Sequence, residues 1–287
     1  MPSRPASPWT APMPPARPPG DMGLWQLPTG TYSTRAALAV TGGSPFEQRA
    51  FAATAVLVRH PLGDLLVDAG FGAAVDEHVA MLARMERPPY HRAGTARAQL
   101  EAAGYDFRRL LGVVVTHVHW DHVSGLDSLD APVWMNSAEA GYGAEDKHGA
   151  VYRAVSETTA TRSYEMADGP YLGFPASWDV HGDGSVVIAH AGGHTPGSVV
   201  VFVALPSGER YGFIGDLTWQ LDGITRGAER PWFMRRVADV DPELVRTGLE
   251  RSIALRDVVH IVPAHDVSAY DPIPRLEQVD PSGTVDA

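Results

Sequence analysis

The sequence predicts a domain in which β-strands alternate with α-helices, of either the α/β or the α+β class. Short apolar and β-branched runs recur along most of the chain, helix-forming segments lie between them, and Gly- or Pro-rich turns separate the two. The length of 287 residues, of which 44% are hydrophobic, is enough to bury a large core. We expect one domain over residues 24–287, preceded by a Pro-rich, flexible tail at 1–23.

The first half of the domain is expected to contain, in order, a strand at 51–58, a strand at 64–68, a helix at 73–86, a helix at 95–103 and a strand at 110–116. The turn His60-Pro61-Leu62-Gly63 joins the first two strands and indicates a hairpin. Gly104 is suited to the left-handed residue that ends a helix. The run 110–116 is continuously apolar, which is typical of a strand buried on both faces.

The second half is expected to contain strands at 185–190, 198–205, 211–214 and 258–262 and a helix at 242–256. Asp241 can cap this helix, and Pro242 suits its first position because proline lacks the amide that a first turn leaves unpaired. Residues 141–180 and 217–240 show no clear period. We therefore expect both segments to be long loops over a functional face.

Charge and composition argue against several classes of function. Lys and Arg number 23 against 34 for Asp and Glu, a net charge of -11, so a surface that grips nucleic-acid phosphates is not expected. The chain has no cysteine, which removes disulfides, thiolate metal sites and a Cys nucleophile. Neither a secretory h-region nor a run of about 18 apolar residues is present, so we expect a cytoplasmic protein without a membrane partner.

The segment after the run 110–116 carries the strongest chemical signal. It reads Thr116-His117-Val118-His119-Trp120-Asp121-His122, and His-x-His-x-Asp-His arises by chance on the order of once in a thousand such chains. Side chains in a loop just after the end of a strand can converge on one point, whereas side chains inside a strand alternate between its two faces. A catalytic zinc needs about three protein ligands and an open position for water, so further ligands are expected elsewhere.

Three candidate ligands each follow another apolar run. They are His194 in Gly192-Gly193-His194-Thr195-Pro196-Gly197, Asp216 after the strand at 211–214, and His265 after the strand at 258–262. Taken singly, each is typical of an ordinary turn residue; together with the motif, they indicate one shared metal site. The histidines in turn-like or helical contexts are expected to face solvent: His60, His78, His91 and His148.

These motifs, in this order, resemble the metallo-β-lactamase superfamily over about residues 50–270. Asp68, in the strand-end segment Asp68-Ala69-Gly70, matches the family's early Asp-x-Gly. The resemblance implies an α+β fold, an αββα sandwich in which two mixed sheets are flanked by helices and the metal site lies at one edge. The resemblance also implies two metals, one held by His117, His119 and His194, the other by Asp121, His122 and His265, with Asp216 bridging them.

Two such metals, about 3.5–4 Å apart, can hold a bridging hydroxide and polarise a carbonyl or phosphoryl oxygen. Asp121 is the candidate catalytic residue, since its carboxylate could move a proton from the attacking water to the leaving group. Asp68 and Thr116 are expected to support the ligands. The expected cofactors are two divalent ions, with zinc as the first choice and Mn, Fe or Co as alternatives, because imidazole and carboxylate suit all of them.

Several features narrow the branch of the family that the chain resembles. Asp216 occupies the position where true β-lactamases generally carry Cys or Ser, so the pattern is closer to acyl-homoserine lactonases, organophosphate hydrolases and glyoxalase-II-type enzymes. The segment after His265 contains Arg275 as its single basic residue, which argues against glutathione thioesters. Candidates for an apolar wall of the substrate pocket are Trp120, Trp219, Trp232 and Phe233.

We therefore expect a dinuclear hydrolase that cleaves a small carboxylic ester, first of all a lactone, as quorum-quenching lactonases do. Phosphotriester or phosphodiester hydrolysis by the same hydroxide is one alternative. A mononuclear-iron persulfide dioxygenase, which would need only His117, His194 and Asp216, is another, and a non-catalytic metal-binding module is a third. A homodimer is compatible with the sequence, because the tail or residues 141–180 could cover a neighbour's pocket.

Overall fold

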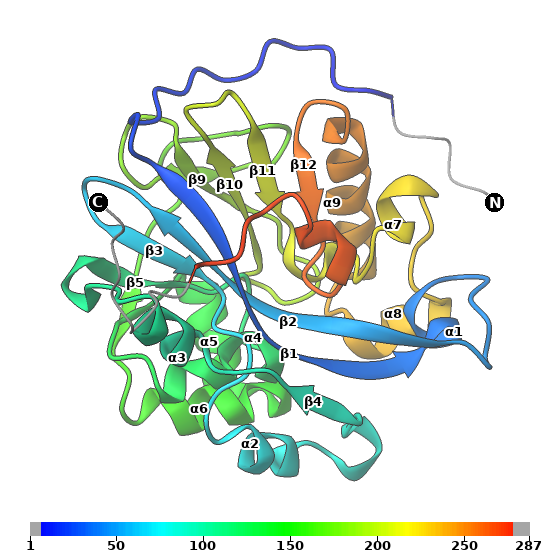
Figure 1. Ribbon diagram of the computed structural model, residues 1–287. Coiled ribbons are helices and arrows are strands. Elements are labelled where there is room, and N and C mark those ends of the chain that lie inside the picture. The colour runs from blue at the N-terminus through cyan, green and yellow to red at the C-terminus, as the bar shows by residue number, and fades with distance from the viewer. Residues whose placement is uncertain (1–6, 278–287) are drawn as a thin grey trace.

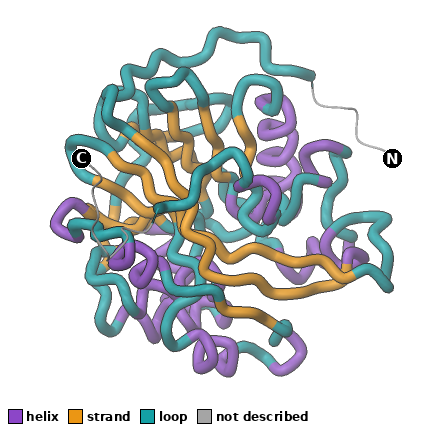
Figure 2. The backbone as a smooth tube through the Cα atoms, in the orientation of Figure 1, coloured by secondary structure: helices purple, strands orange, loops and turns teal. Residues whose placement is uncertain are grey.

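Two β-sheets lie face to face between layers of helices in the computed structural model, which describes residues 7–277 (Figure 1, Figure 2). The seven-stranded sheet has the spatial order β4 (Tyr90–Arg92), β1 (Gly23–Arg35), β2 (Gln48–Arg59), β3 (Asp64–Val67), β5 (Leu110–Val114), β6 (Val133–Met135) and β7 (Thr161–Ser163). The five-stranded sheet has the order β12 (His260–Val262), β11 (Arg210–Phe213), β10 (Val199–Ala204), β9 (Val186–His190) and β8 (Ser177–Asp179).

Both sheets combine parallel and antiparallel pairs. In the first, β2 pairs antiparallel with β3, and β3 pairs parallel with β5. In the second, β10 is antiparallel to β9 and β11, and β11 is parallel to β12. The hairpin predicted around residues 60–63 is present, and the prediction of two mixed sheets in an αββα sandwich is confirmed.

The helices cover the outer faces of the sheets (Figure 1). The α-helices are α1 (Ala36–Ala39), α2 (Val75–Met81), α3 (Ala96–Ala102), α4 (Trp120–Val123), α5 (Ser137–Glu145), α6 (Ala150–Ser156), α7 (Asp222–Thr225), α8 (Trp232–Ala238) and α9 (Pro242–Leu255). The short 3-10 turns are η1 (Arg84–Glu86), η2 (Phe107–Arg109), η3 (Ser124–Asp127), η4 (Lys147–Gly149), η5 (Gly215–Leu217) and η6 (Val267–Tyr270).

The two-residue repeat of the strands divides the core into three layers. On β2, Val56 and Val58 point to the space between the sheets, whereas Ala55 and Leu57 contact the helices on the other side. β10 shows the same alternation, with Val201 between the sheets and the intervening residues facing α9. A strand buried on both faces must be apolar throughout, which explains the continuous runs in the sequence.

The prediction of two long loops at 141–180 and 217–240 is wrong. The first range contains most of α5, all of α6 and the strands β7 and β8, and the second contains α7 and α8. Most of these elements are too short to display a period. Gly141 and Gly143 also lower the helix propensity of α5, and Gly143 is required because a β-carbon there would overlap the ring of Tyr152.

The described part of the predicted flexible tail is packed against the second sheet. Residues 7–22 pass over it as the dark blue segment of Figure 1. The Trp9 amide donates to the Ala254 carbonyl at 2.8 Å, and the Arg17 amide donates to the Asp183 carbonyl at 2.7 Å. Residues 1–6 of the predicted tail lie outside the described residues. Within residues 7–277, no helix has the length and apolar character needed to cross a bilayer.

The cap of α9 gives a test of this fold. Asp241 accepts hydrogen bonds from the amides of Glu243 and Leu244 at 3.1 and 3.0 Å, as the sequence predicts. We expect Asp241→Ala to lower the free energy of unfolding by about 1 kcal/mol, because two amides of the first turn lose their acceptor. Urea unfolding followed by circular dichroism measures this, with the exposed Asp257→Ala as the control. Equal losses in both variants would contradict the assignment.

Candidate metal centre

All seven predicted ligands lie beyond the carboxyl ends of strands that point to one edge of the sandwich. His117 and His119 follow β5, Asp121 and His122 lie on α4, His194 follows β9, Asp216 lies in η5 after β11, and His265 follows β12. Since β9, β11 and β12 run in the same direction, their ends meet at this edge. The ligands therefore come from both sheets.

The structure gathers these residues into two adjacent groups. His117, His119, His194 and Asp216 form one, and Asp121, His122 and His265 form the other; within each group the candidate ligand atoms lie within 4.8 Å of one another. Six of the seven are buried, and His119 is partly buried.

The carboxylate of Asp216 lies between the groups and turns one oxygen to each. Its Oδ2 is 3.3 Å from His194 Nε2 and 3.9 Å from His117 Nε2. Its Oδ1 is 3.0 Å from His265 Nε2 and 3.5 Å from His122 Nε2. A carboxylate in this position can serve two cations at once.

Several atoms facing this centre make no hydrogen bond to the described residues. They include the buried Nε2 atoms of His117 and His122, and the 3.0 Å contact between His265 Nε2 and Asp216 Oδ1 lacks the alignment of a hydrogen bond. A buried polar atom without a partner costs free energy, and so many at one point need an explanation. Imidazole nitrogens and a carboxylate are suitable ligands for zinc and related ions, so the residues present fit a metal.

Asp68 and Thr116 hold the second group in place. Asp68 Oδ2 lies 2.8 Å from His122 Nδ1 and accepts a hydrogen bond from the Thr116 hydroxyl at 2.9 Å. Its other oxygen accepts the Thr116 amide at 2.6 Å. Asp68 has a φ of 55°, a left-handed conformation that is uncommon for a residue with a side chain and that these contacts maintain.

A buried ion pair supports the first group. His194 Nδ1 lies 2.9 Å from Asp239 Oδ1, and the Arg230 guanidinium donates to the same oxygen. Arg230 also donates to the backbone carbonyl of Asp216 at 2.8 Å and stacks 4.8 Å above the ring of Trp219. Trp219 Nε1 in turn donates to Asp216 Oδ2 at 2.8 Å. The Asp216 carboxylate and one histidine are thus fixed by contacts with residues at or near the ends of the segment that contains α8.

His265 is oriented by the backbone, since its Nδ1 donates to the carbonyl of Ala52 on β2 at 2.8 Å. His122, His194 and His265 therefore each engage Nδ1 and leave Nε2 facing the centre. A hydrogen bond at one ring nitrogen sets the direction of the other, which is how proteins orient histidine ligands.

Burial and charge set the protonation of the cluster. Burial, followed by the charge of His122, holds the pKa of His117 well below its usual value. Although burial alone would raise it, the facing histidines, His265 first, hold the pKa of Asp216 well below its usual value. Burial opposes the charge of Asp68 at His122, but the pKa of His122 is raised well above its usual value. A cation that binds at His122 must displace that proton.

A tyrosine that the sequence did not indicate, Tyr32, lies at this site. Tyr32 on β1 has its ring 5.5 Å from the rings of Trp120 and His265. Burial, followed by the charges of Asp121 and Asp216, raises the pKa of Tyr32 well above its usual value, so the phenol keeps its proton and can donate a hydrogen bond. Arg230 and Asp239 were missed too. None of the three has a motif around it that could have indicated its role.

Other aromatic and histidine predictions have mixed outcomes. Trp232, predicted to wall the pocket, is 70% exposed on α8. His60 and His78, predicted to face solvent, are buried, so that prediction is wrong for both. His148 lies with its ring 5.4 Å from that of His119, beside the first group.

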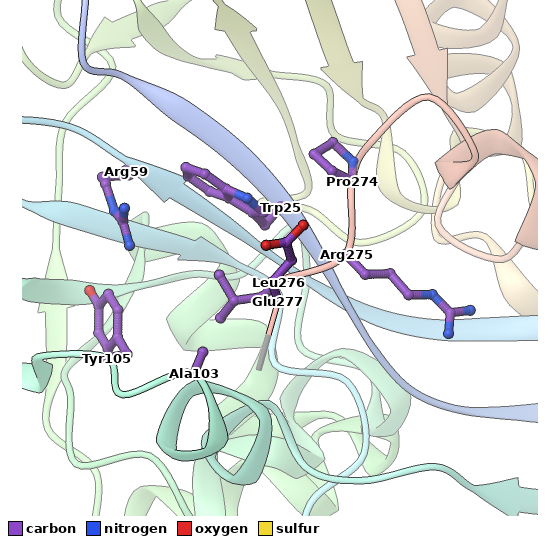
Figure 3. A pocket seen from close by; sticks show the side chains of 8 residues that line it. All are labelled: Trp25, Arg59, Ala103, Tyr105, Pro274, Arg275, Leu276 and Glu277. Atoms are coloured by element: carbon purple, nitrogen blue, oxygen red, sulfur yellow. The ribbon is translucent and has the colours of Figure 1, made fainter. Parts of the chain in front are cut away.

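A cavity of about 290 Å³ opens between the start of β1 and the C-terminal segment (Figure 3). Trp25, Arg59, Tyr105 and Pro274 are among the residues that line it. It contains none of the seven candidate ligands, so it is separate from the metal centre.

Two curated proteins resemble this chain in sequence. A probable metallo-hydrolase of Mycobacterium tuberculosis is 28% identical over 241 residues, covering 75% of this chain and 74% of that protein. An N-acyl homoserine lactonase of Rhizobium johnstonii is 25% identical over 221 residues, covering 75% of this chain and 81% of that protein.

Among solved structures, an N-acyl homoserine lactone hydrolase with N-hexanoyl-L-homoserine bound at its catalytic metal centre superimposes with a TM-score of 0.69. The identity is 16%, and the match covers 89% of this chain and 98% of the other. The family model of the metallo-beta-lactamase superfamily matches residues 49–265, which include every candidate ligand. The chain belongs to the metallo-β-lactamase superfamily and is a metal-dependent hydrolase.

Proposed function

We propose that the protein is a dinuclear lactonase that opens a small lactone by hydrolysis. The observation that carries the proposal is the Asp216 carboxylate, which turns one oxygen to each of two ligand groups. A site for one ion would not need the second group, whose Asp121, His122 and His265 are buried together. Zinc is the first metal to test, because buried imidazole and carboxylate ligands suit it.

The proposed substrate class rests on the surroundings of the site and on the relatives. Aromatic rings of Tyr32, Phe51, Trp120 and Trp219 surround the second group and offer apolar contact to an acyl chain. One relative is named as an acyl-homoserine lactonase, and one similar structure holds the product of such a reaction. A neutral lactone also suits a buried site whose ligands already include two carboxylates.

In this proposal His117, His119 and His194 would hold one ion and Asp121, His122 and His265 would hold the other, with the Asp216 carboxylate between the two groups available to both. Bound divalent ions supply Lewis acidity and an acidic water. Asp121 accepts the proton of the attacking water and returns it to the ring oxygen as the carbon–oxygen bond of the ester breaks. Tyr32 donates its hydroxyl proton in a hydrogen bond to the substrate. The product is a hydroxy acid, which contains all atoms of the lactone and the water.

The metal requirement is the direct test. Purified protein reconstituted with zinc is expected to hold about two ions per chain and to hydrolyse an acyl-homoserine lactone. A chelator should abolish the hydrolysis, and added zinc should restore it. An aryl phosphotriester, and a persulfide with oxygen, serve as competing substrates. Lactone hydrolysis that survives complete metal removal, or faster turnover of a competing substrate, would overturn the proposal.

Asp239 gives a second test, because its charge orients His194. Asp239→Asn keeps the shape of the side chain and removes the charge shared with Arg230. We expect zinc affinity to fall by about tenfold to a hundredfold, as is usual when the partner of a histidine ligand is lost. Competition with a chromogenic chelator measures it. Asp179→Asn, which alters a turn before β9, is the control and should leave zinc affinity unchanged.

Tyr32 gives a third test. Tyr32→Phe keeps the ring that packs on Trp120 and His265 and removes the proton donor. We expect kcat/KM for the lactone to fall by about tenfold, since a hydrogen bond to the reacting substrate is lost, while the zinc content stays at that of the unchanged protein. An unchanged kcat/KM would show that Tyr32 acts only in packing.

A further inference from the structure

Glu139 is a buried carboxylate that lies outside the seven candidate ligands. It is the third residue of α5 and is 1% exposed. Its Oε1 accepts the amide of Val118 at 2.7 Å. Its Oε2 accepts the hydroxyl of Thr195 at 2.7 Å and the amide of Gly197 at 3.0 Å. All three donors are neutral.

These donors belong to the two loops that carry the three-histidine group. Val118 lies between His117 and His119, in the loop that leaves β5 of the first sheet. Thr195 follows His194, in the turn that leaves β9 of the second sheet. One carboxylate therefore connects the two sheets at the point where their histidines must meet.

The backbone around Gly197 is shaped for this contact. Asn136, the N-cap of α5, donates from its amide to the Gly197 carbonyl at 2.7 Å and accepts the Glu139 amide at 3.1 Å. A β-carbon at Gly197 would overlap both Asn136 and Glu139, so only glycine allows the turn to approach the helix. The Gly197 peptide is thus held at both its amide and its carbonyl.

Helix capping alone does not account for this arrangement. In a capping box, a Glu three residues after the N-cap turns back to the N-cap amide of its own helix. The Glu139 carboxylate instead bonds two other loops. A buried carboxylate has a desolvation cost that an apolar side chain at this position would avoid, so its hydrogen bonds must serve those loops.

We propose that Glu139 is a positioning residue that fixes the spacing between the His117–His119 pair and His194. The proposal rests on the proposed function, because it assumes that these histidines share one ion. Glu139 does not touch the substrate. It has no hydrogen bond to Asp121, His122 or His265, so its effect should be confined to the three-histidine group.

The test is Glu139→Gln, in which an amide NH₂ faces donors that need an acceptor. Zinc affinity is measured by chelator competition, the ligand geometry by the visible spectrum of the cobalt-loaded protein, and the loops by amide hydrogen exchange. We expect one of the two ions to bind about tenfold to a hundredfold more weakly and the other to be unchanged. The cobalt spectrum should change, and the amides of Val118 and Gly197 should exchange faster even without metal.

Two matched pairs of variants separate positioning from general loss of stability. Asp64 is a carboxylate with 0% exposure, away from the metal centre. It accepts the His60 amide at 3.0 Å and the Tyr105 hydroxyl at 2.9 Å, and it also pairs with the Arg109 guanidinium at 3.1 Å. Asp64→Asn should lower stability without changing zinc affinity. Gly197→Ala should reproduce the effect of Glu139→Gln, whereas Gly141→Ala, in open space on the same helix, should not.

Equal loss of both ions in Glu139→Gln, or the same result in Asp64→Asn, would overturn the proposal. If Glu139→Gln does not fold, Thr195→Val removes a single donor and should weaken the same ion to a smaller degree. Failure of the proposed function is a separate outcome, seen in the unchanged protein as absence of zinc binding or of lactone hydrolysis. In that case, amide hydrogen exchange at Val118 and Gly197 that is the same in Glu139→Gln as in the unchanged protein would still overturn the positioning role.

Discussion

The buried carboxylate of Asp216 is the constraint on which the rest of the site depends. It faces histidine nitrogens on two sides, and several of these atoms have no partner among residues 7–277. Desolvating so many polar groups at one point is unfavourable unless a strong ligand compensates for it. Metal binding at these nitrogen and carboxylate ligands can compensate for this cost. The fold therefore preorganises the cluster as a metal site. This lowers the stability of the metal-free protein, and metal binding offsets the loss.

Three further carboxylates hold this cluster, and each bonds a different part of the sandwich. Asp68 orients His122 from the end of β3, and Asp239 orients His194 from the end of α8. Glu139 connects the loops after β5 and β9. Ligands from two separate sheets need such connections, because neither sheet by itself fixes the distance to the other. Rigid support of this kind is what a reaction at a fixed metal centre requires.

The sequence was most informative where the candidate ligands lie close together in the chain or directly after an apolar run. His117 to His122 form one short motif, and the apolar runs before His194, Asp216 and His265 correctly indicated strand ends. Tyr32, Glu139, Arg230 and Asp239 could not be found in this way. They reach the site through tertiary contacts, and each is an unremarkable residue in its own segment. The helices between 137 and 156 were missed because glycines and short length hide their period.

The start of α9 touches the metal centre through its backbone. The amides of Val240 and Asp241 donate to the carbonyls of His194 and Gly193 at 3.2 and 2.8 Å. The turn that carries His194 is therefore hydrogen-bonded to the residues that begin α9. Metal occupancy and the folding of this helix are then thermodynamically linked, since a ligand that binds only the folded state stabilises it. Cells starved of metal would hold a protein that is less resistant to heat and to proteases, and its abundance would follow the metal supply.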